Sequence, residues 1–210
     1  MQLRYYQQQA INCTMDWFMK NAGNPLIVLP TGTGKALLCA ELARIACAYP
    51  NTNVLVVTHV RELVRQNYEE MKALWPQVDA GIYSASLDRK DTGKRVTFCS
   101  IQTVFRSWDR VPRPDIIIID EAHLIPRKAE TMYGKFLAAM KVVNPMVRVI
   151  GLTATPHRMD SGRLDEGDDR IFHGISYEYG IAQAIADGFL APVVSKDPKM
   201  HLDTANVGTR

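Results

Sequence analysis

Short apolar runs alternate along the chain with longer segments in which apolar residues recur at helical spacing. In the first such segment Leu38, Leu42 and Ile45 fall on one helical face. Strands that are apolar on both faces and separated by helices are typical of a parallel sheet covered on both sides. The pattern therefore predicts an α/β fold, with strands at 26–29, 54–57, 78–83, 96–99, 116–119 and 147–152 and helices at 35–48, 60–74 and 129–140.

Two polar segments interrupt this pattern and predict loops, at 88–95 and 160–169. The second holds five carboxylates, and a metal site there is the less favoured alternative to a surface loop. The stretch 196–210 is polar and irregular, which predicts a linker.

Composition fits one globular domain, with 210 residues, 47% hydrophobic and 22% charged. The net charge of +3 is too small to establish a polyanionic partner. No apolar run approaches the roughly 18 residues of a membrane span, and the N-terminus lacks an apolar signal segment. The four cysteines form no metal-binding pattern and read as buried thiols of a reducing compartment. We therefore expect a cytoplasmic protein with no membrane partner.

The segment from Pro30 to Ala36 lies between a predicted strand and a predicted helix, where a phosphate-binding loop belongs. Glycines let successive N–H groups turn toward phosphate oxygens, and the helix N-terminus adds partial positive charge. Lys35 would reach the outer phosphates. An ordinary glycine-rich turn is the weaker alternative. The expected phosphate-binding positions are Thr31, Gly32, Thr33, Gly34, Lys35 and Ala36.

Ala36 departs from the usual phosphate-loop pattern, in which Lys is followed by Ser or Thr whose hydroxyl ligates Mg²⁺. A methyl group cannot do so. Because Mg²⁺ readily retains water ligands, nucleotide binding can persist while hydrolysis weakens.

An acidic pair, Asp120 and Glu121, follows the four isoleucines of the strand at 116–119. The carboxyl end of a buried parallel strand is where α/β folds bind ligands. Asp120 there can hold Mg²⁺ through water, and Glu121 can deprotonate an attacking water. A strand end that simply meets solvent is the alternative reading.

These segments together resemble the first lobe of superfamily 2 DEAH-type helicases and translocases. Asp120-Glu121-Ala122-His123 is similar to motif II, Gly151 to Pro156 to motif III, and Pro30 to Lys35 to motif I. Leu3 to Gln7 resembles the Q motif, and the segments Thr58 to Gln66 and Ser100 to Thr103 resemble nucleic-acid motifs. The stretch 179–192 is similar to the end of this lobe in the type III restriction-subunit branch, which includes RadD-type repair proteins.

The resemblance implies a RecA-like P-loop NTPase that uses ATP and Mg²⁺. Gln7 would read adenine, Arg4 would lie against the base, and Lys35, Asp120 and Glu121 would serve hydrolysis. His123, Thr153 and Thr155 would couple nucleotide state to nucleic acid, with DNA favoured over RNA. The implied nucleic-acid contacts are Thr58, His59, Arg61, Gln66, Ser100, Gln102 and Thr103.

The resemblance also implies a domain organisation, with residues 1–195 as the first RecA-like lobe and 196–210 as a linker toward a second lobe. The second lobe would supply an arginine finger, which in related systems accelerates phosphoryl transfer by about 10³–10⁵. The isolated lobe should therefore hydrolyse ATP weakly. A kinase-like P-loop enzyme is disfavoured by Asp120 to His123 and by Thr153 to Thr155. A nucleotide-dependent binding module remains open because of Ala36.

Overall fold

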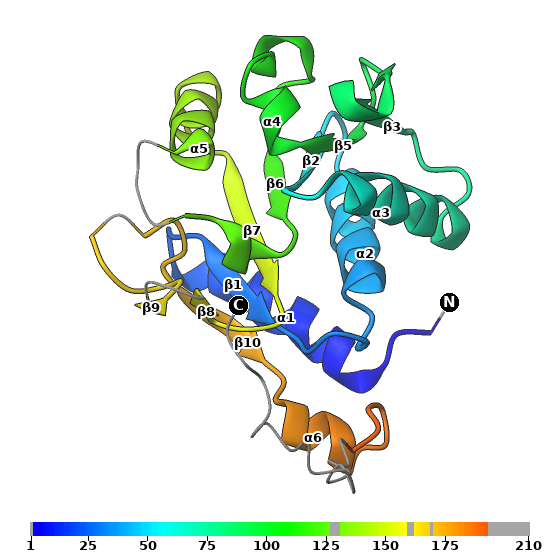
Figure 1. Cartoon of the computed structure of the whole chain (residues 1–210), viewed down its shortest axis with the longest axis vertical. Coiled ribbons are helices and arrows are strands. Elements are labelled where there is room, and N and C mark those ends of the chain that lie inside the picture. Colours follow the sequence, from blue (N-terminus) through cyan, green and yellow to red (C-terminus); the bar gives the residue numbers. More distant parts are fainter. Residues whose placement is uncertain (1, 127–130, 159–161, 169, 193–210) are drawn as a thin grey trace, which may run out of the picture.

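The computed structural model describes residues 2–126, 131–158, 162–168 and 170–192 (Figure 1). The strands are β1 (Pro25–Val28), β2 (Val54–Thr58), β3 (Ala80–Ser84), β4 (Arg89–Lys90), β5 (Val96–Ser100), β6 (Ile116–Ile119), β7 (Arg148–Thr153), β8 (His157–Arg158), β9 (Gly162–Arg163) and β10 (Gly174–Glu178). The α-helices are α1 (Tyr5–Lys20), α2 (Lys35–Cys47), α3 (Arg61–Leu74), α4 (Ile101–Val104), α5 (Met132–Val143) and α6 (Ile181–Ala186). Short 3₁₀ turns are η1 (Ala85–Leu87), η2 (Trp108–Arg110) and η3 (Ala122–Leu124).

Eight strands form one sheet in the order β10-β1-β7-β6-β2-β5-β3-β4. Every pairing is parallel except that of β3 with β4, which is antiparallel. The strand ends that follow β1, β2, β5, β6 and β7 consequently meet at one edge of the sheet. This edge collects the predicted site residues.

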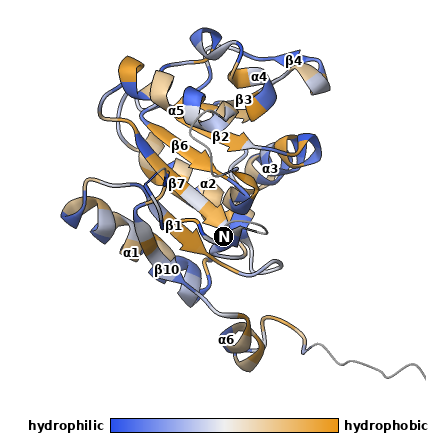
Figure 2. Cartoon of the chain, turned by 60° about the vertical axis from the view of Figure 1, so that its left-hand side comes forward, coloured by the Kyte–Doolittle hydropathy of each residue, from blue (hydrophilic) through white to orange (hydrophobic). Residues whose placement is uncertain are grey.

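Alternating side chains of the central strands build two separate cores, because successive residues of a strand point to opposite faces. Ile118 and Ile150 pack with α1, α2 and α3 on one face, whereas Ile117 and Ile119 pack with α4 and α5 on the other. Figure 2 shows the apolar strands in the interior and polar residues on the outward surfaces of the helices. The predicted α/β fold with helices on both faces is therefore confirmed.

Five predicted strands and two predicted helices agree with the structure to within one residue at their ends. The strand expected at 78–83 begins instead at Ala80, because Val78 N–H donates to Trp75 O within a turn. The helix expected at 129–140 is described over Met132–Val143, where the Thr131 hydroxyl accepts a hydrogen bond from Gly134 N–H and caps the helix. Residues 129 and 130 lie outside the described residues.

The loop prediction for 88–95 was wrong in part, because β4 pairs with β3 there. The loop prediction for 160–169 was also wrong in part, because β9 pairs with β8 there. Residues 160, 161 and 169 lie outside the described ranges. The linker prediction for 196–210 also falls outside them.

The other compositional expectations have mixed outcomes. Cys39, Cys47 and Cys99 are buried as expected, whereas Cys13 is only half-buried. In the described part of the chain no helix combines the length and the apolar character that crossing a bilayer requires.

Candidate functional site

The loop between β1 and α2 curls around the N-terminus of α2. Gly32 and Gly34 adopt φ values of 83° and 81°, a left-handed conformation that glycine accepts without steric cost. Lys35 begins the helix, and its Nζ lies 3.4 Å from Leu29 O, to which it donates. The backbone of this loop and the positive end of α2 are thus arranged as an anion-binding site.

Thr33, in the middle of the loop, faces inward. Its side chain is fully buried, and its hydroxyl donates to Pro30 O at 2.6 Å. Its carbonyl accepts hydrogen bonds from Tyr6 Oη at 2.8 Å and from Gln7 Nε2 at 3.0 Å. The side chain and carbonyl of Thr33 are therefore engaged within the protein, and its backbone N–H donates to Pro30 O at 3.4 Å, so Thr33 could donate to a phosphate only by giving up that long bond.

Gln7 supports the loop directly, and its side chain is buried. Its amide donates to the carbonyls of Thr33 and Gly34, and its Oε1 accepts from Arg4 N–H at 2.9 Å. Gly34 has φ 81°, and a Cβ added there would lie 2.7 Å from Gln7 Nε2, so a larger residue would strain the backbone and displace the Gln7 amide. The predicted role of Gln7 toward adenine stays a prediction, and in this structure its carboxamide is occupied by the loop.

Arg4 lies beside the same loop at the start of α1. Its guanidinium sits 4.5 Å from the centre of the Phe189 ring and donates to Tyr6 Oη at 3.0 Å. The predicted contact of Arg4 with a nucleotide base would add a second aromatic partner to this cation–π pair.

Asp120 follows β6 and is 8% exposed. Its Oδ2 accepts a hydrogen bond from Asn67 Nδ2 at 2.8 Å, and its Oδ1 accepts from Glu121 N–H at 2.9 Å. Each carboxylate oxygen retains a further lone pair for water. The described residues contain no cluster of three or more His, Cys, Asp or Glu side chains suited to a metal. Asp120 therefore fits Mg²⁺ only as one ligand, or through water, alongside phosphate and further waters.

Glu121 is held in a conformation that is rare for a non-glycine residue, with φ 50° and ψ 51°. Its Oε1 lies 3.7 Å from Lys35 Nζ, and its Oε2 lies 3.3 Å from His123 Nδ1. Oε2 is buried and makes no hydrogen bond within the described part of the chain. A buried carboxylate oxygen without a donor is suited to accept a proton from a bound water.

A chain of contacts continues from Glu121 to β7. His123 Nδ1 lies 3.1 Å from Thr153 Oγ1, and Thr153 Oγ1 donates to Thr155 O at 2.8 Å. Thr155 Oγ1 in turn donates to His157 O. The structure thus joins the three residues predicted to couple the site, and it places them directly beside the acidic pair.

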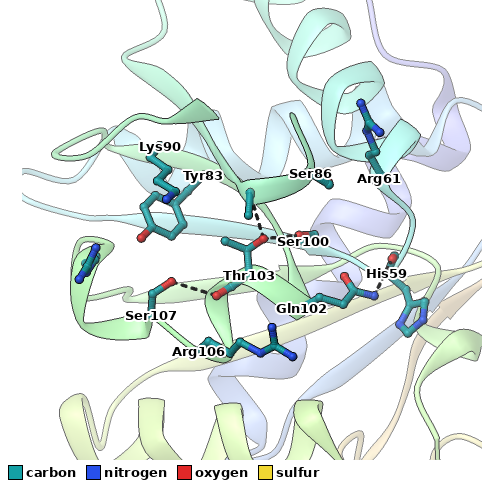
Figure 3. Close-up of a pocket in the computed structure, with 12 residues that line it drawn as sticks. His59, Arg61, Tyr83, Ser86, Lys90, Ser100, Gln102, Thr103, Arg106 and Ser107 are labelled. Atoms are coloured by element: carbon teal, nitrogen blue, oxygen red, sulfur yellow. Dashed lines mark hydrogen bonds between the residues drawn. The ribbon is translucent and has the colours of Figure 1, made fainter. Parts of the chain in front are cut away.

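A second site lies along the same sheet edge, in a hollow of about 430 Å³ (Figure 3). The Ser100 and Thr103 hydroxyls lie 2.9 Å apart, Thr103 Oγ1 accepts from Ala85 N–H, and Gln102 Nε2 donates to His59 O at 3.1 Å. These bonds fix a polar wall. The lining residues are His59, Arg61, Tyr83, Ala85, Ser86, Lys90, Ser100, Gln102, Thr103, Arg106, Ser107 and Arg110.

Four cations line this hollow, namely Arg61, Lys90, Arg106 and Arg110, and all are exposed. Within the residues that the structure describes, none of them makes an ion pair, and no Asp or Glu side chain lines the hollow. An uncompensated group of cations beside hydroxyls and amides suits a phosphodiester backbone.

The hollow brings together five of the seven residues predicted to contact nucleic acid, whereas Thr58 and Gln66 lie apart from it. The Thr58 side chain is fully buried and its hydroxyl donates to Val60 O at 2.9 Å, so it shapes the entry to α3. Gln66 is exposed on α3, where its amide donates to Glu70.

Several site residues escaped the sequence analysis. Asn67 occupies the buried face of α3 together with Val64 and Met71, and a polar residue at this helical spacing is the signal that could have revealed it. Lys90 belongs to the unpredicted strand β4, and Arg106 and Arg110 follow α4 without a motif of their own. Tyr6, Tyr179 and Asp187 become neighbours only in the folded chain.

Comparison with known proteins gives a family match. Residues 1–158 match the family model described as "Type III restriction enzyme, res subunit". A relative in Saccharomyces cerevisiae, IRC3, is named as a candidate ATP-dependent helicase; it is 27% identical over 215 residues, covering 98% of this chain and 30% of the yeast protein. The chain therefore spans about a third of that relative.

Solved structures share the fold. The helicase domain of Hef from Pyrococcus furiosus matches with a TM-score of 0.63 and 23% identity, over 83% of this chain and 38% of that one. A nuclease-deletion mutant of the Type ISP restriction-modification enzyme LlaGI, in complex with a DNA substrate mimic, matches with a TM-score of 0.63 and 17% identity, over 90% of this chain and 21% of that one. These likenesses show that the chain has the RecA-like fold of those domains.

Proposed function

Because this chain belongs to the family of the type III restriction enzyme res subunit, we propose that it is the ATP-binding motor lobe of a DEAH-type superfamily 2 helicase or translocase. The observation that carries the proposal is the Glu121 carboxylate. Its Oε1 lies 3.7 Å from Lys35 Nζ, and its buried Oε2 lies 3.3 Å from His123 Nδ1 but makes no hydrogen bond in the described part of the chain. This arrangement suits the deprotonation of a water that attacks a phosphate held by the loop.

The residues divide the work of hydrolysis. The backbone N–H groups of 31–36 and the Lys35 ammonium bind the phosphates, and Asp120 holds Mg²⁺, directly or through water. Bound Mg²⁺ neutralises charge that develops on the phosphate oxygens. Glu121 accepts the proton of the water. When a phosphate draws Lys35 away from Glu121, that carboxylate becomes free to reorient.

The hollow beside β5 would bind the nucleic-acid strand along which the motor moves, which we call the track. Its hydroxyls, amides and four cations would contact the sugar-phosphate backbone without reading sequence. DNA is favoured over RNA, since the LlaGI structure holds a DNA substrate mimic. His123, Thr153 and Thr155 would carry a change at the nucleotide to the other lobe and to the track.

A second RecA-like lobe with an arginine finger completes the proposed motor. The curated relative is about three times as long as this chain, which leaves room for such a lobe there. The isolated 210-residue chain should bind ATP and hydrolyse it slowly.

A second candidate function rests on Ala36. This half-buried methyl group stands where a hydroxyl would ligate Mg²⁺. The alternative is therefore a nucleotide-dependent nucleic-acid-binding module with weak or no hydrolysis.

One experiment separates the two functions. ATP hydrolysis is measured on a two-lobe form of the protein, with and without single- and double-stranded DNA and RNA, beside Ala36→Thr and Glu121→Gln. The motor predicts stimulation by one nucleic acid and a loss of about 10²–10⁴-fold in Glu121→Gln. Hydrolysis that appears only in Ala36→Thr would favour the binding module. Stimulated hydrolysis that survives in Glu121→Gln would refute the assigned base.

A further inference from the structure

The segment that follows β10 reaches back to the phosphate loop. Figure 1 shows α6, in orange, at the end of the molecule where α1 begins. A Cβ added at Gly32, at the tip of the loop, would lie 3.3 Å from Leu190 Cδ2. Both α6 and Leu190 lie beyond position 158, where the family match ends. Part of the loop's surroundings therefore comes from outside the matched region.

Asp187 gathers three donors at this place. Its Oδ2 accepts hydrogen bonds from Tyr179 Oη at 2.6 Å and from Tyr5 Oη, and its Oδ1 accepts from Gln183 Nε2 at 2.7 Å. Tyr5 belongs to α1, whereas Tyr179 directly follows β10. One carboxylate oxygen thus ties the start of α1 to the end of β10, and charge-assisted hydrogen bonds are the stronger class.

Tyr6 carries this connection to the loop. Its ring stacks on the Tyr179 ring, with centroids 4.3 Å apart and planes 10° apart, and Phe189 meets it edge-on at 5.2 Å. The side chain of Tyr6 is fully buried, and its hydroxyl donates to Thr33 O at 2.8 Å. A displaced Tyr179 would therefore shift the hydroxyl that fixes the centre of the phosphate loop.

We infer that Asp187, Tyr5 and Tyr179 are positioning residues for triphosphate binding, which set the phosphate loop through Tyr6. The inference rests on the proposed function, because it requires that the loop bind phosphate. These residues should affect the binding of the phosphates and not that of the nucleotide base.

The test measures the dissociation constants of ATP and of inorganic tripolyphosphate, both with Mg²⁺, by titration calorimetry on the 210-residue chain. The variants are Tyr6→Phe, Asp187→Asn and the double variant. Tyr177→Phe is the matched control, because Tyr177 also links β10 to α1, through Gln9 Oε1 at 2.9 Å, but does not touch the loop. The unfolding of each variant is followed in parallel at the same temperature, because a reversibly unfolded fraction would by itself lower the apparent affinity.

We expect Asp187→Asn to weaken the binding of ATP and of tripolyphosphate by the same factor, about two- to tenfold, the worth of one hydrogen bond. Tyr6→Phe should weaken tripolyphosphate binding by a similar factor and ATP binding at least as much, because it also removes the acceptor of the Arg4 guanidinium. The double variant should bind each ligand no more weakly than the single variant with the lower affinity, since Asp187 acts through Tyr6. Tyr177→Phe should bind like wild type.

Three results would overturn the inference: ATP weakened with tripolyphosphate unchanged, no change in either ligand, or fully additive effects in the double variant. Lys35→Ala separates this failure from that of the proposed function. If wild type binds both ligands and Lys35→Ala loses both, the phosphate loop stands even where the Asp187 variants show no effect. If wild type binds neither ligand, the proposed function itself fails.

Discussion

The two sites on this sheet edge treat their charges in opposite ways. At the nucleotide site Lys35 pairs with Glu121, which also lies beside His123, and Asp120 is held by Asn67. In the hollow beside β5 the four cations have no ion-pair partner in the described part of the chain. A ligand must exchange partners at the first site, whereas it only adds partners at the second.

This difference has a physical consequence for binding. Paired, partly buried charges give an ordered site, and removing one of them is costly because the other is left buried without a partner. Exposed, unpaired cations act additively and are screened by salt. A single substitution should therefore lower ligand affinity strongly at the nucleotide site and only modestly in the hollow.

The largest effect should follow from Lys35→Ala. The ammonium contributes charge to the phosphates, and its removal leaves Glu121 unpaired beside them. We expect ATP affinity to fall roughly 30-fold or more, which corresponds to about 2–5 kcal/mol. Titration calorimetry on the 210-residue chain measures this.

Nucleic-acid affinity in the absence of nucleotide serves as the control, because Lys35 does not line the hollow. ATP affinity that is unchanged in a folded Lys35→Ala variant would contradict the assignment of the loop.

Asn67→Ala should give the next largest effect, on stability. Asn67 is 7% exposed, and its amide donates to Asp120 Oδ2 at 2.8 Å. Removing the donor leaves a nearly buried carboxylate oxygen without that bond, which lowers the free energy of unfolding by about 1–3 kcal/mol. Urea unfolding measures the loss. The matched control is Gln66→Ala, at the exposed neighbouring position, where we expect a change within about 0.5 kcal/mol. Equal losses in the two variants would refute the role of Asn67.

The same contrast explains what could be predicted from the sequence. The alternation of apolar runs predicted the α/β fold, and the loop at 30–36 and the acidic pair at 120–121 follow predicted strands, so their proximity could be expected. Of the four cations of the hollow, Arg61 was predicted, whereas Lys90, Arg106 and Arg110 could not be foreseen. Lys90 is placed by a two-residue strand, and its approach to Arg106 depends on strand order, which local patterns do not encode.

Long-range contacts around the phosphate loop were equally hidden. Tyr6 and Tyr179 are far apart in sequence, and neither apolar spacing nor a motif predicts that their rings stack. The buried orientation of Thr58 was missed because the residue stands at a strand end, where a side chain can face either the interior or solvent.

Arg106→Gln should weaken nucleic-acid binding more modestly. Loss of one phosphate contact changes affinity by about four- to fivefold at ~0.15 M salt and lowers the slope of log affinity against log salt by about 0.7–0.9. Fluorescence anisotropy with a labelled single-stranded oligonucleotide over a salt series measures both. ATP affinity should not change.

The matched control is Lys141→Gln, which removes an exposed cation of α5 that does not line the hollow. An equal loss of affinity and slope in this control would mean that net charge, and not the hollow, binds the nucleic acid.

The smallest effect concerns acid stability at Asp187. Hydrogen bonds from Tyr179 and then Tyr5 hold the pKa of this carboxyl below its usual value, and burial raises the pKa of Tyr179 so that it stays a donor. A carboxyl whose folded-state pKa is depressed adds stability above its unfolded pKa of about 4 and loses it as pH falls through the folded value. We therefore expect the Tm difference between wild type and Asp187→Asn to be constant from about pH 5 to 8 and to close below about pH 4. Arg106→Gln, in a hollow that no carboxylate of the described residues lines, should show no such pH-dependent difference. A difference for Asp187→Asn that persists in strong acid would show that the hydroxyl donors gain nothing from the charge of Asp187.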